Sequence, residues 1–144
     1  MGLEAVLVDH SPMTVPALDP ADDRQVTVEV AGVAALLVAK AHKIRDRVDS
    51  GRSDRLSDKD AADVYRIMQT TRPAVVAATM RTLIDDPMSA EVTVQALGFM
   101  RDLFARRAGE GVAMAQRALQ LAVDPHQVAA LCAAFTEQLL APRM

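Results

Sequence analysis

Apolar residues recur at the three- and four-residue spacing of an α-helix through most of this chain, and glycine, proline or aspartate residues interrupt that spacing repeatedly. Each interruption separates one amphipathic stretch from the next, so the pattern predicts short helices that pack in succession. The predicted helices cover about 33–48, 57–70, 73–85, 89–108, 112–123 and 125–139.

The first thirty residues carry a different pattern, in which short runs of apolar residues alternate with turn residues. Strands are predicted at 3–8, 13–18 and 25–30, with a turn at 9–12. The third strand is the clearest, because valines alternate with polar residues along it. A sheet of such short strands is only marginally stable alone, so we expect it to pack against the helices.

The predicted fold class is therefore α+β and predominantly helical, with a small N-terminal β-sheet of short strands followed by a bundle of about six helices. We expect one domain over residues 1–144, in which 1–30 hold the short strands and 31–144 the helical region. Hydrophobic residues make up 51% of the chain but aromatic residues only 3%, so the core must be built from Ala, Val, Leu and Met.

Charge and cysteine usage narrow the class of protein. The net charge of -3 provides no global field for nucleic acid or an anionic membrane, so any contact with RNA must be local. Cys132 is the only cysteine, which excludes an internal disulfide and favours a reducing compartment. Because neither a signal peptide nor a membrane span is predicted, we expect a cytoplasmic protein.

Three cations occupy an unusual position on the first predicted helix. Its apolar stripe consists of Val33, Leu36, Leu37, Ile44 and Val48. Lys40 falls in the middle of that stripe, Lys43 and Arg47 fall beside it, and His42 is predicted to face solvent together with Arg45 and Asp46. A lysine placed there must reach water along its aliphatic stem, pair with an acid, or line a cavity that receives an anion.

The second predicted helix supplies acids that match these cations. Ser57 is a candidate N-cap, and Asp60 follows it at the spacing of a capping box. Asp60 and Asp63 lie on the flank of the predicted buried stripe, so both can face the first helix. Two interpretations of Asp60 stay open, a capping acid and a site residue, since one carboxylate can serve both roles. The buried stripe itself comprises Ala61, Val64, Tyr65 and Met68.

Other motifs do not indicate chemistry. The adjacent residues Asp9, His10 and Ser11 cannot provide the geometry of a hydrolase triad. The three histidines, at 10, 42 and 126, lack the spacing of metal ligands, so we expect no metal site. The segment from Gly109 to Gly111 is too short to cradle a phosphate and indicates a helix junction.

One stretch resembles a known family. It contains, in order, a strand, the segment Leu-Leu-Val-Ala-Lys-Ala-His-Lys-Ile, a basic loop and the segment Asp-Lys-Asp-Ala-Ala-Asp-Val-Tyr at 58–65. This order is similar to the C-terminal part of AbiEii/AbiGii toxin-type nucleotidyltransferases. The resemblance covers residues 26–68, and the later helices resemble the family only in character.

The resemblance implies a nucleotide or phosphate site. Lys40 and Lys43 match the family's lysines that face a nucleoside triphosphate, whereas Lys59, Asp60 and Asp63 match its downstream motif. Arg47 adds a third cation beside the two lysines. In isolation we expect no cofactor; if the resemblance extends to function, it implies Mg²⁺ and an NTP.

The family's Gly-Ser turn and paired Asp-x-Asp acids have no counterpart here, so no catalytic residue is assigned. Two functions are therefore expected. One is a truncated nucleotidyltransferase-like protein, catalytically incomplete alone, that binds a nucleotide and depends on a polypeptide supplying the missing sheet. The other is a non-enzymatic helical interaction module or homodimer, in which the cations only form salt bridges.

Overall fold

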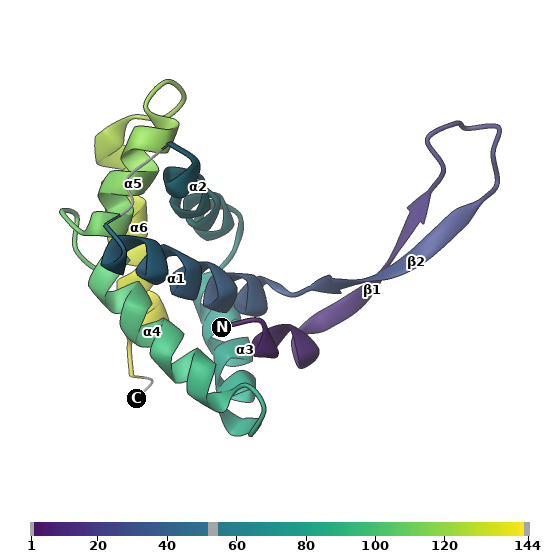
Figure 1. Cartoon of the computed structure of the whole chain (residues 1–144), viewed down its shortest axis with the longest axis horizontal. Helices are drawn as coiled ribbons and strands as arrows, with labels where there is room; N and C mark the ends of the chain where they lie inside the picture. Colours follow the sequence, from purple (N-terminus) through teal and green to yellow (C-terminus); the bar gives the residue numbers. More distant parts are fainter. Residues whose placement is uncertain (1, 52–54, 143–144) are drawn as a thin grey trace.

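Six α-helices form the body of the protein within residues 2–51 and 55–142, the ranges that the computed structural model describes (Figure 1). The predicted α+β, predominantly helical class is confirmed. Among the described residues, no helix combines the length and apolar character needed to cross a bilayer. The helices are α1 (Val33–Asp49), α2 (Arg55–Thr70), α3 (Pro73–Asp85), α4 (Ala90–Phe104), α5 (Glu110–Leu119) and α6 (Pro125–Leu140).

Local sequence signals account for several helix ends. Prolines start α3 and α6, where a missing backbone N–H costs nothing. The Asp124 carboxylate accepts hydrogen bonds from the backbone N–H groups of His126 at 2.8 Å and Gln127 at 3.2 Å, so it caps α6. The predicted cap of α2 is wrong, because this helix begins at Arg55 and Ser57 lies inside it. A loop is predicted at 52–56, but residues 55 and 56 belong to α2, and residues 52–54 lie outside the described residues.

The buried face of α1 differs from the predicted stripe. Leu37 and Ile44 are fully buried as expected, whereas Val33 and Leu36 are each 37% exposed. The buried arc extends instead to Val38, Ala41 and His42, because α1 packs against both α2 and α4. Small alanines on this face allow close approach between the helices.

The prediction that His42 faces solvent is wrong. Its side chain is buried, and Nε2 lies 2.8 Å from the Val92 carbonyl oxygen of α4, to which it donates a hydrogen bond. The ring also meets Phe99 edge to face, with 5.1 Å between centroids. A histidine on an amphipathic helix is thus buried because a backbone acceptor satisfies its ring N–H.

The N-terminal residues form a smaller sheet than predicted. Strand β1 (His10–Pro16) pairs antiparallel with β2 (Gln25–Ala31), and the predicted strand at 3–8 is instead a 3-10 helix, η1 (Glu4–Leu7). The predicted turn at 9–12 is also wrong, since most of it belongs to β1. We call β1, β2 and their connecting loop the β-ribbon. It projects away from the helices instead of packing against them (Figure 1).

Asp9 anchors the β-ribbon to the helical body. Its Oδ2 atom accepts a hydrogen bond from the Ala35 backbone N–H at 2.9 Å, and its carbonyl accepts one from Gly32 N–H at 2.8 Å. Asp9 therefore caps α1 from a distance, while the N-cap residue itself, Gly32, has no side chain. A Cβ atom added at Gly32 would lie 1.9 Å from the Asp9 Oδ1 atom, so this close approach requires glycine.

We expect Gly32→Ala to lower the free energy of unfolding by about 2 kcal/mol, because the added methyl group displaces the capping carboxylate. The coupling between Gly32→Ala and Asp9→Ala is measured by urea denaturation of the wild type, both single variants and the double variant. The cost of Gly32→Ala should shrink once Asp9 is alanine. Equal costs in both backgrounds would contradict the assigned contact.

Candidate functional site

Three cations of α1 meet two acids of α2 at the seam between these helices. The Lys40 ammonium lies 2.8 Å from Asp60 Oδ1 and 2.7 Å from Asp63 Oδ2. Lys43 Nζ lies 2.9 Å from Asp60 Oδ2, and Arg47 pairs with the same oxygen. The prediction that Asp60 and Asp63 face the first helix is confirmed. We define the basic cluster as Lys40, Lys43, Arg47, Asp60, Asp63 and Arg66, the last of which pairs with Asp63 at 2.9 Å.

Helical spacing explains why these residues meet. The cations of α1 are separated by three and four residues, so their side chains leave the helix on one face. Asp60 and Asp63 are three residues apart on α2 and share the face that packs against α1. Because α2 begins well before Asp60, this carboxylate does not act as a cap but as the centre of the ion pairs.

Burial and ion pairing oppose each other at the Lys40 ammonium. Desolvation alone would lower the pKa of Lys40, but its hydrogen bonds to Asp60 and Asp63 raise that pKa above its ordinary value. Burial likewise acts to raise the pKa of Asp60, whereas hydrogen bonds from Lys40 and Lys43 lower it overall. The pKa of Asp63 is lowered for the same reason. All these groups are therefore charged at neutral pH.

Positive charge exceeds negative charge in the basic cluster. Its four cations and two carboxylates leave a net charge of +2, in a chain whose total is -3. Asp60 is 6% exposed, whereas the side chains of Lys43 and Arg66 are each 57% exposed. The charge of Asp60 is thus buried, and part of the positive charge faces solvent. Such an arrangement attracts anions.

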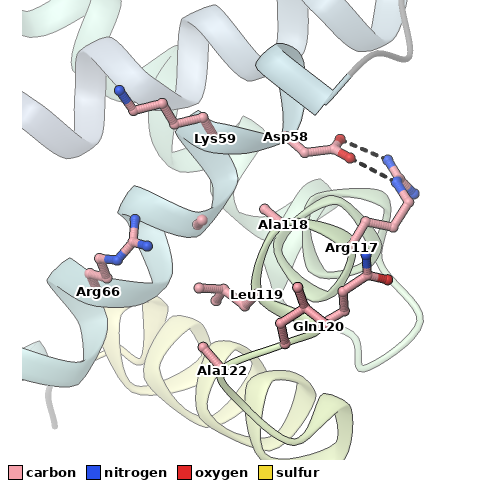
Figure 2. A pocket seen from close by; sticks show the side chains of 10 residues that line it. Asp58, Lys59, Arg66, Arg117, Ala118, Leu119, Gln120 and Ala122 are labelled. Carbon is pink, nitrogen blue, oxygen red and sulfur yellow. Dashed lines mark hydrogen bonds and ion pairs between the residues drawn. The ribbon is translucent and has the colours of Figure 1, made fainter.

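Lys59, the remaining predicted site residue, lies apart from the ion pairs. It lines a pocket of about 470 Å³ between α2 and the end of α5, together with Arg66 and Arg117 (Figure 2). Lys59 and Arg66 extend from α2 on the side of this pocket opposite Arg117. Arg66 therefore belongs both to the pocket and to the basic cluster. The apolar lining consists of Ala62, Ala118, Leu119, Leu121 and Ala122.

A second ion pair lies at one end of the pocket. Arg117 donates hydrogen bonds to both carboxylate oxygens of Asp58, each at 2.9 Å, and this pairing raises the pKa of Arg117. Asp58 is buried. The sequence does not reveal this pair, because 59 residues separate its members and no local periodicity connects them. Arg66 did carry a signal, namely its position three residues after Asp63.

The residues considered for other chemistry have separate roles. Asp9 caps α1, and His10 Nδ1 lies 2.7 Å from Glu29 Oε2 across the β-ribbon. Cys132 is buried, which raises the pKa of its thiol to about 12 and leaves it unreactive at neutral pH. Within the described ranges, no group of three or more His, Cys, Asp or Glu side chains is arranged to hold a metal ion.

Comparison with known proteins finds no matching family model, no matching curated protein and no matching solved structure.

Proposed function

We propose that the basic cluster binds the phosphate groups of a nucleoside triphosphate, within a nucleotidyltransferase-like protein that is catalytically incomplete on its own. The observation that carries the proposal is the net charge of +2 at the seam between α1 and α2. The resemblance of residues 26–68 to AbiEii/AbiGii-type nucleotidyltransferases supports it, since Lys40, Asp60 and Asp63 are the residues that carry that resemblance.

The six residues divide into two roles. Asp60 and Asp63 hold Lys40 and Arg47 in place, so these cations are oriented before a ligand arrives. Lys43 and Arg66 are the most exposed cations of the cluster and make the direct contacts with phosphate oxygens. The ligand gains charge-assisted hydrogen bonds without the cost of immobilising all four side chains.

The adjacent pocket accommodates the rest of the nucleotide. Arg66 connects the cluster to the pocket, and half of the residues that line this pocket are alanine or leucine. A base and sugar need such an apolar surface with polar groups at its border. Lys59 lies at that border, on the same side of the pocket as Arg66, and adds a further positive charge.

The donor set of the cluster does not fit a resident Mg²⁺ ion. Both carboxylates accept hydrogen bonds from lysine or arginine, which compete with a metal for the same oxygens. Mg²⁺ enters the proposal only with the nucleotide, bound to its phosphate oxygens. The paired acids that a transferase requires would come from another polypeptide, which also supplies the missing strands.

We expect ATP with Mg²⁺ to raise the melting temperature of the wild-type protein. At a free concentration ten times the Kd, binding stabilises the folded state by about 1.4 kcal/mol, or a shift of about 4 °C. Lys43→Ser should abolish most of this shift, because it removes an exposed phosphate contact with little loss of stability. Lys40→Ala should weaken the shift as well.

Arg107→Ser provides the matched control, since Arg107 is an exposed cation outside the cluster and the pocket. This variant should retain the full wild-type shift. The proposal fails if millimolar ATP produces no shift in the wild type, or if Lys43→Ser and Arg107→Ser respond equally.

A second candidate function, a non-enzymatic interaction module, is favoured by the β-ribbon. All seven residues of β1 and the first five of β2 are exposed. A ribbon of two strands without packing on either face is marginal by itself. The ribbon therefore provides a surface for another chain, and its geometry specifies the kind of pairing.

A further inference from the structure

We infer that two copies of this chain pair antiparallel through the free edges of their β2 strands and form a four-stranded sheet with twofold symmetry. This inference does not depend on nucleotide binding. It rests on which backbone groups of the β-ribbon face outward, on where its prolines lie, and on the side chains that the pairing places opposite each other.

The hydrogen-bond pattern shows which backbone groups are used inside the ribbon. Gly32 N–H donates to the Asp9 carbonyl at 2.8 Å, and Ala17 N–H donates to the Arg24 carbonyl at 2.9 Å. The register pairs Met13 with Val28 between these two bonded pairs. Because bonded positions alternate along an antiparallel ladder, odd residues of β1 and even residues of β2 bond to each other. The outward N–H and C=O groups of β2 therefore belong to Gln25, Thr27, Glu29 and Ala31.

The two long edges of the ribbon differ in their capacity to accept another strand. The outward positions of β1 include Pro12 and Pro16, which have no N–H to donate. Prolines on an edge strand block its extension. No proline occupies an outward position of β2, so its edge offers a complete row of donors and acceptors. An added strand can therefore pair with β2 but not along the full length of β1.

A second copy of β2 can form hydrogen bonds with this row of outward donors and acceptors in one register. When the twofold axis passes beside Val28, each outward residue meets an outward residue of the other copy, and the full length of both strands overlaps. Thr27 then faces Glu29 of the second copy. Shifting the axis to Glu29 would place two carboxylates opposite each other, which is destabilising. Charge and length together select the register centred on Val28.

Side chains on one face of the ribbon agree with this pairing. Met13, Val15, Val26 and Val28 share that face and are between 41% and 56% exposed. In the dimer, Val28 lies beside its symmetry copy and Val26 beside Val30 of the second copy, so each shields apolar surface of the other. The ribbon projects from the body with its edges free (Figure 1), and antiparallel pairing places the two helical bodies at opposite ends of the sheet.

Light scattering on the full chain should give a mass twice the monomer's 15.5 kDa. Thr27→Pro should convert the dimer into a monomer, because it removes an outward N–H without breaking the ladder inside the ribbon. Thr14→Pro is the matched control: Thr14 pairs with Thr27 within the ribbon but faces the other edge, so the dimer should persist. Circular dichroism of both variants verifies that the helices are intact.

Cysteine cross-linking tests the register. Val28→Cys should form an intermolecular disulfide under mild oxidation, since a non-hydrogen-bonded pair has Cα atoms about 4.5 Å apart. Thr27→Cys should cross-link far less, because residue 27 faces residue 29 of the other copy. The native Cys132 is buried and does not compete. A monomeric wild type, a dimer that survives Thr27→Pro, or efficient cross-linking at 27 but not 28 would each overturn the inference.

Discussion

Asp60→Asn is expected to lower the free energy of unfolding by about 3 kcal/mol, the largest effect of any single change in the basic cluster. The Asp60 carboxylate is almost fully buried and receives Lys40, Lys43 and Arg47. A neutral amide of the same size leaves these three cations close together without their shared counter-ion. Urea denaturation at neutral pH measures the change.

Two other variants of the cluster calibrate this result. Asp63→Asn should cost about 1 kcal/mol, because Asp63 is 28% exposed and one of its cations, Lys40, retains Asp60. Lys43→Ser should cost less than about 1 kcal/mol, since the Lys43 side chain is 57% exposed. If Asp60→Asn costs no more than these two, Asp60 is not the centre of the cluster.

The stability of the wild type should fall as the pH drops below about 5, because protonation of Asp60 and Asp63 breaks their ion pairs. Both carboxyl groups have a pKa in the folded state below the ordinary value. Such groups stabilise the fold at any pH above their unfolded pKa, and this contribution is lost as the pH falls through the lowered folded pKa. We therefore expect stability to decline as the pH falls from about 5 through the lowered folded pKa of these two groups.

Denaturation across that pH range in wild type and Asp60→Asn isolates the contribution of the cluster. The variant should show a shallower decline, since one of the two groups no longer titrates. If the stability of the two proteins declines equally as the pH falls, Asp60 is not a source of the pH dependence.

Lys40 should give the opposite pH dependence at high pH. Its raised pKa stabilises the folded state, and this stability is lost as the pH rises above the ordinary lysine value.

The helices could be predicted from sequence because their signals are local. Pro73, Pro125 and the Asp124 cap mark helix starts within a few residues, and the apolar spacing identifies most of the core. The meeting of Lys40 with Asp60 and Asp63 was also predictable. It required only that two adjacent helices pack with their matching flanks together.

The β-ribbon could not be predicted in the same way. Pro12 indicated a turn, yet the strand tolerates it because its missing N–H faces outward from the ladder. The alternation of valines along β2 predicts a strand, but it does not reveal that both faces are exposed. His42 and the pair of Asp58 with Arg117 depend on distant partners, which periodicity does not report.

The most direct test of nucleotide binding is a titration of the ¹⁵N-labelled protein with ATP and Mg²⁺, followed by amide chemical shifts. We expect saturable shifts concentrated at Lys43, Asp60, Asp63 and Arg66, extending to the pocket lining near Leu119. Most of these shifts should be lost in Lys43→Ser, and all should persist in Arg107→Ser. An unchanged spectrum at millimolar ATP, or shifts confined to residues away from the seam of α1 and α2, would contradict it.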